Sequence, residues 1–326
     1  MQLNDLRKSM KGVFIVHMTP FNKDGSLDLE GMRGNIRWLL KSTAGKDFAF
    51  VPEGSNGECF AQSEDEWKSV VKMVVEEVNG KHPVIVGAGQ PSTRETVKRC
   101  QYAESVGADA VMVILPYYVV SQEEGLYQHY KQIAESVDIG VVIYNNPFVN
   151  GTWVRPPLMA RLAKIPNIVA VKENVSSVIS FSLMQKAVGK NMAVLCGRGE
   201  EIFPFRAPLG CPGFISYLAN FAPDIAYSMY EAAIAKDFDR VYEISFSLSP
   251  FFKDVEILKC MTPPVVSFTS KVGANHGPGA GLTGGGGDSM QFGWVKSAMD
   301  MVGLRGGEVR LPLLAINEKE KVELKD

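Results

Sequence analysis

Short apolar runs alternate with longer amphipathic segments over the first 235 residues of the chain. Runs rich in β-branched residues predict buried strands at 12–16, 48–51, 83–86, 110–115, 139–144, 168–171, 193–195 and 213–217. Apolar positions at helical spacing predict helices at 29–40, 64–78, 92–106, 121–137, 156–163, 178–188, 200–208 and 223–235. Ser63 and Glu66 have the spacing of a capping box at the start of the second helix. Eight strand-then-helix units imply parallel strands and predict an α/β fold, the (β/α)₈ TIM barrel.

The pattern changes after residue 235, where helical segments follow one another without strands between them. Helices are predicted at 239–248, 253–259, 292–302 and 318–325. We therefore expect a catalytic barrel at 1–235 and a C-terminal helical region at 236–326. A glycine-rich insertion at 267–291 interrupts that region. We interpret it as a linker, with a lid over the active site as the alternative, and it lacks the Gly-Lys-Ser/Thr sequence of a phosphate-binding loop.

Composition narrows the class of function. The chain has 326 residues, 46% of them hydrophobic, and a formal net charge of -2. A net charge so close to zero gives no sign of the positively charged surface that binds nucleic acid or an anionic membrane. The five cysteines are scattered without CxxC spacing, which argues against disulfides and a zinc site and favours a reducing compartment. Neither a secretory signal nor a membrane-spanning apolar run is apparent, so we expect a cytoplasmic protein.

We looked for candidate catalytic residues where the predicted strands end, because the catalytic groups of parallel barrels lie at the carboxyl ends of the strands. Lys172 follows the apolar run 168–171. An amine kept away from water is held neutral more easily and becomes a nucleophile, whereas the alternative is a lysine that simply reaches solvent. Other groups at strand ends are Gly54, Ser55, Asn56, Gly57, Glu58, Tyr117, Tyr118 and Tyr144.

Together these groups favour carbonyl chemistry through an imine. Lys172 attacks a ketone to form a Schiff base, and a tyrosine hydroxyl moves the protons. The glycine-flanked Ser55–Asn56 turn suits a carboxylate beside the ketone, so the expected substrate is a 2-oxo acid. No metal or cofactor is required, and the four histidines indicate no metal cluster. The alternatives are rim packing for the tyrosines, a tight turn for the glycines, a cap for Ser55, and structural hydrogen bonds to backbone amides for Glu58.

Five motifs, each at a strand end, resemble those of one known family. They are GSNGE at 54–58, PYY and SQEEGLYQHYKQIAE within 116–135, YNNP at 144–147, VAVKE at 169–173 and GFISYLAN at 213–220. In this order they resemble the dihydrodipicolinate synthase and N-acetylneuraminate lyase family, whose members are (β/α)₈ barrels that form a Schiff base with pyruvate. The resemblance runs from about residue 12 to 235 and resumes near 292–312.

The resemblance implies roles for the residues at matching positions. Lys172 is similar to the Schiff-base lysine and Tyr144 to the proton shuttle. Ser55 falls at the hydroxyl of the proton relay and, with Asn56, at the pair that holds the pyruvyl carboxylate. Ile215 falls where a backbone carbonyl lines the pocket.

The remaining implied roles concern assembly. Tyr118 resembles a tyrosine that reaches into the relay of a neighbouring subunit, and Tyr117 one that stacks at that interface. The family is typically a tetramer built from dimers, so we expect a homo-oligomer, either a dimer or a tetramer.

Two departures from the family pattern bear on the second substrate. Asn56 stands where threonine or serine is common, and Val149 stands where the synthases carry an arginine for the second substrate's carboxylate. Loss of a bidentate anchor weakens binding strongly, which favours the lyase and sugar-acid aldolase branch. We therefore predict a metal-independent class I lyase or aldolase that releases or condenses pyruvate. The alternatives are a 2-keto-3-deoxy sugar acid dehydratase, a 4-hydroxy-tetrahydrodipicolinate synthase, and a non-catalytic barrel that binds a small acid.

Overall fold

Eight parallel strands form the centre of the molecule and confirm the expected (β/α)₈ barrel. The computed structural model describes residues 2–248, 251 and 289–325. The strands are β1 Gly12–Val16, β2 Phe48–Val51, β3 Ile85–Gly87, β4 Ala110–Ile114, β5 Gly140–Asn145, β6 Ile168–Glu173, β7 Ala193–Cys196 and β8 Gly213–Ser216. They are hydrogen-bonded in the order β2-β1-β8-β7-β6-β5-β4-β3. An isolated parallel bridge between Phe50 and Val84 joins the two ends of this order and closes the barrel.

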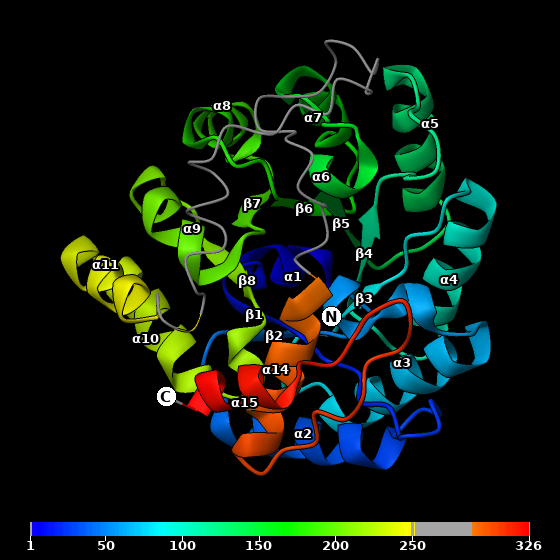
Figure 1. Ribbon diagram of the computed structural model, residues 1–326. Coiled ribbons are helices and arrows are strands. Elements are labelled where there is room, and N and C mark those ends of the chain that lie inside the picture. Colours follow the sequence, from blue (N-terminus) through cyan, green and yellow to red (C-terminus); the bar gives the residue numbers. More distant parts are fainter. Residues whose placement is uncertain (1, 249–250, 252–288, 326) are drawn as a thin grey trace, which may run out of the picture.

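Helices surround the strands as a ring, which is seen along the barrel in Figure 1. Those that follow the strands are α2 Leu29–Ser42, α3 Glu64–Val78, α4 Thr93–Ser105, α5 Glu123–Ala134, α7 Pro156–Leu162, α8 Val178–Val188, α9 Gly199–Arg206 and α10 Pro223–Ile234. The predicted capping box of α3 is present, because Ser63 accepts from the Glu66 amide and Glu66 accepts from the Ser63 amide. Two short helices, α1 Leu3–Ser9 and α6 Pro147–Asn150, were not expected from the sequence.

Two separate apolar cores follow from the alternation of side chains along each strand. One core fills the space between the strands and the surrounding helices. The other fills the inside of the barrel and includes Phe14, Val142 and Tyr144. Leu6 of α1 belongs to this inner core, and a Cβ built on Gly140 would lie only 2.4 Å from its Cδ2 atom. Helix α1 therefore closes the end of the barrel at which the strands begin.

The C-terminal region has described helices both before and after the residues that the structure does not describe. Its described helices are α11 Phe238–Ser247, α14 Ser289–Met301 and α15 Glu318–Lys325, and Figure 1 shows α14 and α15 side by side. Phe292, Val295 and Met299 of α14 form a small core with Met18, which follows β1. Helix α14 is thereby fixed against the barrel at the end where β1 finishes.

Several boundaries differ from the sequence-based expectation. Strand β6 continues to Glu173, so Lys172 lies within the strand and not just beyond it. Helix α14 begins at Ser289 and takes up the last three residues of the glycine-rich segment. The helix expected at 253–259 and the rest of that segment, 267–288, lie outside the described residues. The division into regions 1–235 and 236–326 stays a prediction.

Candidate active site

Lys172 and Tyr144 meet inside the barrel. Their Cα atoms are partners on the neighbouring strands β6 and β5, so both side chains point to the same side of the sheet. Tyr144 belongs to the inner core together with Ala170, two residues before Lys172, whereas Val171 belongs to the outer core. The Lys172 Nζ atom lies 3.7 Å from the centroid of the Tyr144 ring, and the lysine is only 4% exposed. The structure thus brings together the predicted nucleophile and the predicted proton shuttle.

Asn146 fixes the phenol from beyond the end of β5. Its Nδ2 atom donates a hydrogen bond of 2.9 Å to the Tyr144 Oη atom. Its Oδ1 atom accepts from the Phe148 amide and caps α6. Sequence reasoning assigned no role to Asn146, although its place in the YNNP motif offered the signal.

The outer side of β6 is fixed by Glu173, which follows the candidate nucleophile. The buried Glu173 carboxylate accepts from Val175 N at 2.8 Å, Asn145 Nδ2 at 2.8 Å and Trp153 Nε1 at 3.3 Å. Burial raises the pKa of Glu173 to about 7, although these donors oppose the shift.

The buried Arg206 guanidinium donates to the Glu173 carbonyl and to the Val175 carbonyl. The strand end that carries Lys172 is therefore held from outside the barrel by several hydrogen bonds.

The glycine-flanked turn predicted to bind a carboxylate lies at the end of β2. Ser55–Gly57 form a 3₁₀ turn, and Glu58 closes it with a left-handed backbone at φ 54°. A Cβ on Gly54 would lie 3.1 Å from Val16 Cγ1, and one on Gly57 would lie 3.1 Å from the His17 carbonyl. A side chain at either position would therefore crowd β1 or the residue that follows it. The turn stands at the same end of the barrel as Lys172, because all strands are parallel.

The other predicted residues divide between the barrel and the surface. The side chain of Ile215 in β8 lies in the inner core, and the predicted role of its backbone carbonyl stays a prediction. Tyr118 is 86% exposed, and Tyr117 is also exposed, so neither joins the buried Lys172–Tyr144 pair within one chain. Their predicted roles depend on a second subunit and remain predictions.

The described part of the chain contains neither a cluster of metal-binding side chains nor a helix that could span a membrane. Residues 2–248, 251 and 289–325 include no group of three or more His, Cys, Asp or Glu side chains placed to hold a metal ion. Within the same residues, no helix combines the length and the apolar character that crossing a membrane requires.

Comparison with known proteins places this geometry in context. The profile described as "Dihydrodipicolinate synthetase family" matches residues 9–276. A protein of Methanothrix thermoacetophila named 4-hydroxy-tetrahydrodipicolinate synthase is 34% identical over 317 residues, covering 97% of this chain and 95% of that protein. The solved dihydrodipicolinate synthase from Aquifex aeolicus superposes with a TM-score of 0.79 at 30% identity, covering 97% of this chain and 96% of that one.

Two further relatives bear on substrate and assembly. The protein of Archaeoglobus fulgidus with the same synthase name is 34% identical over 316 residues, covering 97% of this chain and 96% of that protein. A solved structure titled as a monomeric dihydrodipicolinate synthase variant has a TM-score of 0.78 at 32% identity, covering 97% and 95% of the two chains. These names do not support the expected leaning toward the lyase branch.

Proposed function

Since the chain belongs to the dihydrodipicolinate synthetase family, we propose that Lys172 forms a Schiff base with the carbonyl of a 2-oxo acid, in the first place pyruvate. The chain is a lyase of the class I aldolase type. The observation that carries the proposal is the Lys172 amine, buried in the barrel and 3.7 Å from the centroid of the Tyr144 ring.

The chemistry follows from these two side chains. The amine of Lys172 attacks the ketone carbon to form a carbinolamine. The hydroxyl group of the carbinolamine takes a proton from Tyr144 and leaves as water, and a protonated imine forms. This imine withdraws electrons from the neighbouring carbon, which then makes or breaks a carbon–carbon bond. Tyr144 accepts and returns the protons of these steps, with its Oη atom oriented by the hydrogen bond from Asn146.

The turn at the end of β2 provides the site for the carboxylate of the substrate. The first amides of a 3₁₀ turn have no acceptor within the turn, so they are available to an anion. Ser55 and Asn56 begin this turn, and their side chains can donate as well. In this proposal Ser55 also belongs to the proton relay, and the backbone carbonyl of Ile215 lines the pocket.

A second candidate activity is that of a 4-hydroxy-tetrahydrodipicolinate synthase, in which the pyruvyl imine condenses with aspartate semialdehyde. The names of the relatives favour it. Val149 still argues against it, because the anchoring arginine is absent at that position. Arg198, however, places its guanidinium carbon 5.3 Å from the Phe148 ring centroid and donates to Ser176 Oγ. An arginine from the end of β7 thus stands beside the segment that carries Val149.

Trapping of the imine tests the proposed function. The chain is incubated with pyruvate, reduced with borohydride and weighed as the intact protein. We expect an adduct on the unmodified chain and on a Lys131→Ala control, which changes a partly exposed lysine of α5, but none on Lys172→Ala. Absence of the adduct from the unmodified chain would favour the non-catalytic barrel that binds a small acid.

Product analysis separates the activities that share this imine. Consumption of aspartate semialdehyde together with pyruvate identifies the synthase. Pyruvate and an aldehyde released from a longer 2-oxo acid identify the lyase or aldolase. A dehydrated acid formed without pyruvate identifies the 2-keto-3-deoxy sugar acid dehydratase.

A further inference from the structure

Glu58 closes the turn that is proposed to hold the substrate carboxylate, and it is buried together with a lysine from the C-terminal region. The side chains of Glu58 and Lys296 are 0% and 2% exposed. The Lys296 Nζ atom donates to the Glu58 Oε1 atom at 2.5 Å. These residues lie 238 positions apart in the sequence and belong to different regions of the chain. The pair therefore joins helix α14 directly to the turn.

Lys296 is held in place by two further contacts. Its Nζ atom donates to the Glu308 carbonyl at 2.6 Å and lies 4.7 Å from the centroid of the Phe21 ring. Burial lowers the pKa of Lys296, and the charge of Glu58 opposes this effect. The ammonium thus contacts a carboxylate, a carbonyl and an aromatic face, which favour its charged form, while the charge of Arg310 opposes it.

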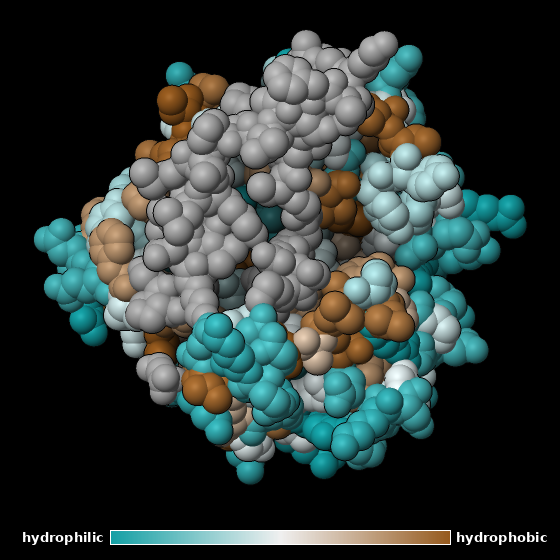
Figure 2. Space-filling view, viewed as in Figure 1, coloured by the Kyte–Doolittle hydropathy of each residue, from teal (hydrophilic) through white to brown (hydrophobic). Residues whose placement is uncertain are grey.

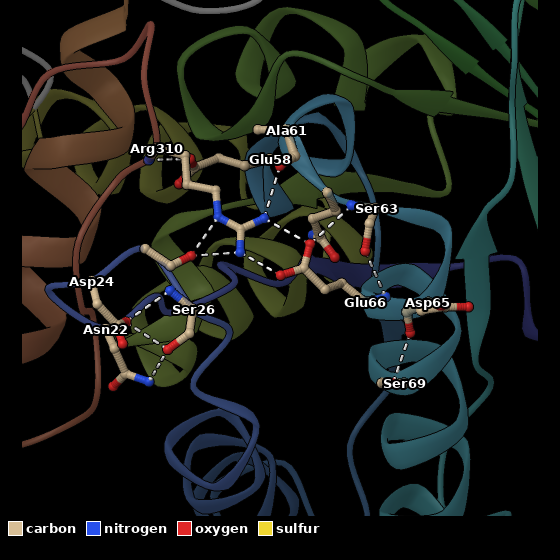
Figure 3. Close-up of polar contacts among 12 residues, drawn as sticks. Asn22, Asp24, Ser26, Glu58, Ala61, Ser63, Asp65, Glu66, Ser69 and Arg310 are labelled. Carbon is tan, nitrogen blue, oxygen red and sulfur yellow. Dashed lines mark hydrogen bonds and ion pairs between the residues drawn. The ribbon is translucent and has the colours of Figure 1, made fainter.

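The second oxygen of Glu58 is also bound by the C-terminal region. The Arg310 amide donates to the Glu58 Oε2 atom at 2.9 Å. Figure 3 shows the Arg310 guanidinium reaching Ala61 and the carboxylate of Glu66. The segment after α14 therefore contacts both the carboxylate that closes the turn and the capping residue at the start of α3.

A break in the Glu58–Lys296 pair leaves a charge without its partner in a place that water does not reach. A buried charge that loses its partner is strongly unfavourable, so the remaining side chain changes protonation or moves. The backbone of Glu58 is part of the turn itself, because its left-handed conformation ends the 3₁₀ turn and its amide donates to the Ser55 carbonyl. The disturbance would therefore reach the amides of Ser55 and Asn56.

We propose that Lys296 and Glu58 are positioning residues, which hold the Ser55–Gly57 turn in the shape that receives the carboxylate of the 2-oxo acid. This inference rests on the proposed function of that turn. It assigns to helix α14 a part in substrate affinity, although α14 contributes no group to the chemistry at Lys172.

The test compares four variants with the unmodified chain. Lys296→Met removes the charge and keeps the length of the side chain, while Glu58→Gln keeps the shape of the carboxylate. The double variant Lys296→Met/Glu58→Gln removes both charges. Glu77→Gln is the control, because it breaks partly buried ion pairs with Arg33 and Arg37 that lie between α2 and α3, away from the turn. Pyruvate affinity is measured by calorimetry and as the half-saturating concentration for borohydride trapping, and thermal unfolding is followed in parallel.

We expect Lys296→Met to weaken pyruvate affinity roughly ten- to a hundredfold, with the yield of adduct at saturation unchanged. The double variant should recover part of the affinity, because no unpaired charge remains, and Glu77→Gln should bind pyruvate like the unmodified chain. If Lys296→Met is recovered poorly, Glu58→Gln gives the same comparison with a smaller change of shape.

Two results would overturn the inference, and they are distinct. Equal pyruvate affinity in Lys296→Met, Glu77→Gln and the unmodified chain, with only thermal stability reduced, would show that the pair is structural while the proposed function stands. An unmodified chain that neither traps nor binds pyruvate would remove the proposed function, and the inference with it.

Discussion

Tyr144 and Lys172 are register partners on adjacent parallel strands, and the lysine amine lies against the face of the phenol ring. Because side chains alternate along a strand, a shift of one residue in β6 would turn Lys172 toward the surrounding helices. The register between β5 and β6 therefore decides whether the two groups meet. Asn146 then orients the phenol that this register brings to the amine.

Substitution of Tyr144 by phenylalanine tests the role of its hydroxyl. The Tyr144→Phe variant keeps the ring beneath the Lys172 amine but removes the Oη atom that is proposed to move protons. We expect kcat to fall about 10²- to 10⁴-fold, with the fold retained by circular dichroism. Asn146→Ala, which keeps the hydroxyl but removes its donor, should lower kcat less. Equal kcat in Tyr144→Phe and the unmodified chain would show that another group moves the protons.

A substitution at Gly197, which follows β7, tests how closely this segment packs against the candidate nucleophile Lys172. A Cβ at this position would lie 1.9 Å from Asn174 Oδ1 and 3.0 Å from Lys172 Cγ, so both side chains must shift. We expect Gly197→Ala to slow borohydride trapping of pyruvate roughly tenfold or more, since small displacements of reacting groups are costly.

The matched control for this change is Gly125→Ala in helix α5. A Cβ at Gly125 meets no atom within 4 Å, and alanine favours the helix. We expect a gain in unfolding free energy of about 0.5 to 1 kcal/mol with trapping unchanged. Trapping that is equally fast in both alanine variants would contradict the close packing around Lys172.

The burial of Glu53 predicts that the free energy of unfolding depends on pH. Its side chain is buried at the end of β2 and accepts from Gln62 Nε2 at 3.2 Å. Burial raises its pKa from 4.5 to about 8, and the charge of Arg99 opposes this only in part. The folded state therefore binds more protons than the unfolded state between these values, so the contribution of Glu53 to stability is present at low pH and is lost as pH rises toward 8.

The Glu53→Gln variant removes this titration. Its stability relative to the unmodified chain should improve by roughly 2 kcal/mol between pH 5.5 and 7.5. Urea unfolding at the two pH values measures the difference. A difference that stays constant across this range would show that Glu53 is ionised in the folded protein throughout.

The exposed loop after β4 tests the predicted assembly. Tyr117, Tyr118, Val119 and Val120 are all exposed, and Figure 2 shows that apolar residues lie at several places on this face of the described chain. If a second copy covers them, Tyr118→Arg should lower the mass measured by sedimentation, because a charge at an apolar interface is unfavourable. The comparison matters because one solved relative is titled as monomeric.

A second variant at the same position separates assembly from catalysis. Tyr118→Phe keeps the ring for the interface and removes the hydroxyl that is predicted to reach a neighbouring subunit's relay. We expect an unchanged mass with a lower kcat. A monomeric unmodified chain with full activity would contradict both roles.

Local signals in the sequence were sufficient for the barrel and for the candidate nucleophile. The bounds of β1 and β2 follow from runs of apolar residues, and the start of α3 follows from the spacing of Ser63 and Glu66. Lys172 stood out because it follows an apolar run that predicts a buried strand. All these features depend on neighbours along the chain, and periodicity and capping report such neighbours directly.

Contacts between distant segments were decided only by the tertiary structure. The length of β6 and its register with β5 place Lys172 over Tyr144, and the return of α14 to the barrel buries Lys296 against Glu58. Glu58 and Lys296 lie 238 residues apart, and no periodic pattern in the sequence relates them. A contact of this kind depends on how every intervening element packs. The sequence therefore determined the barrel and singled out the candidate nucleophile, whereas only the folded chain determined which distant residues contact the Ser55–Gly57 turn.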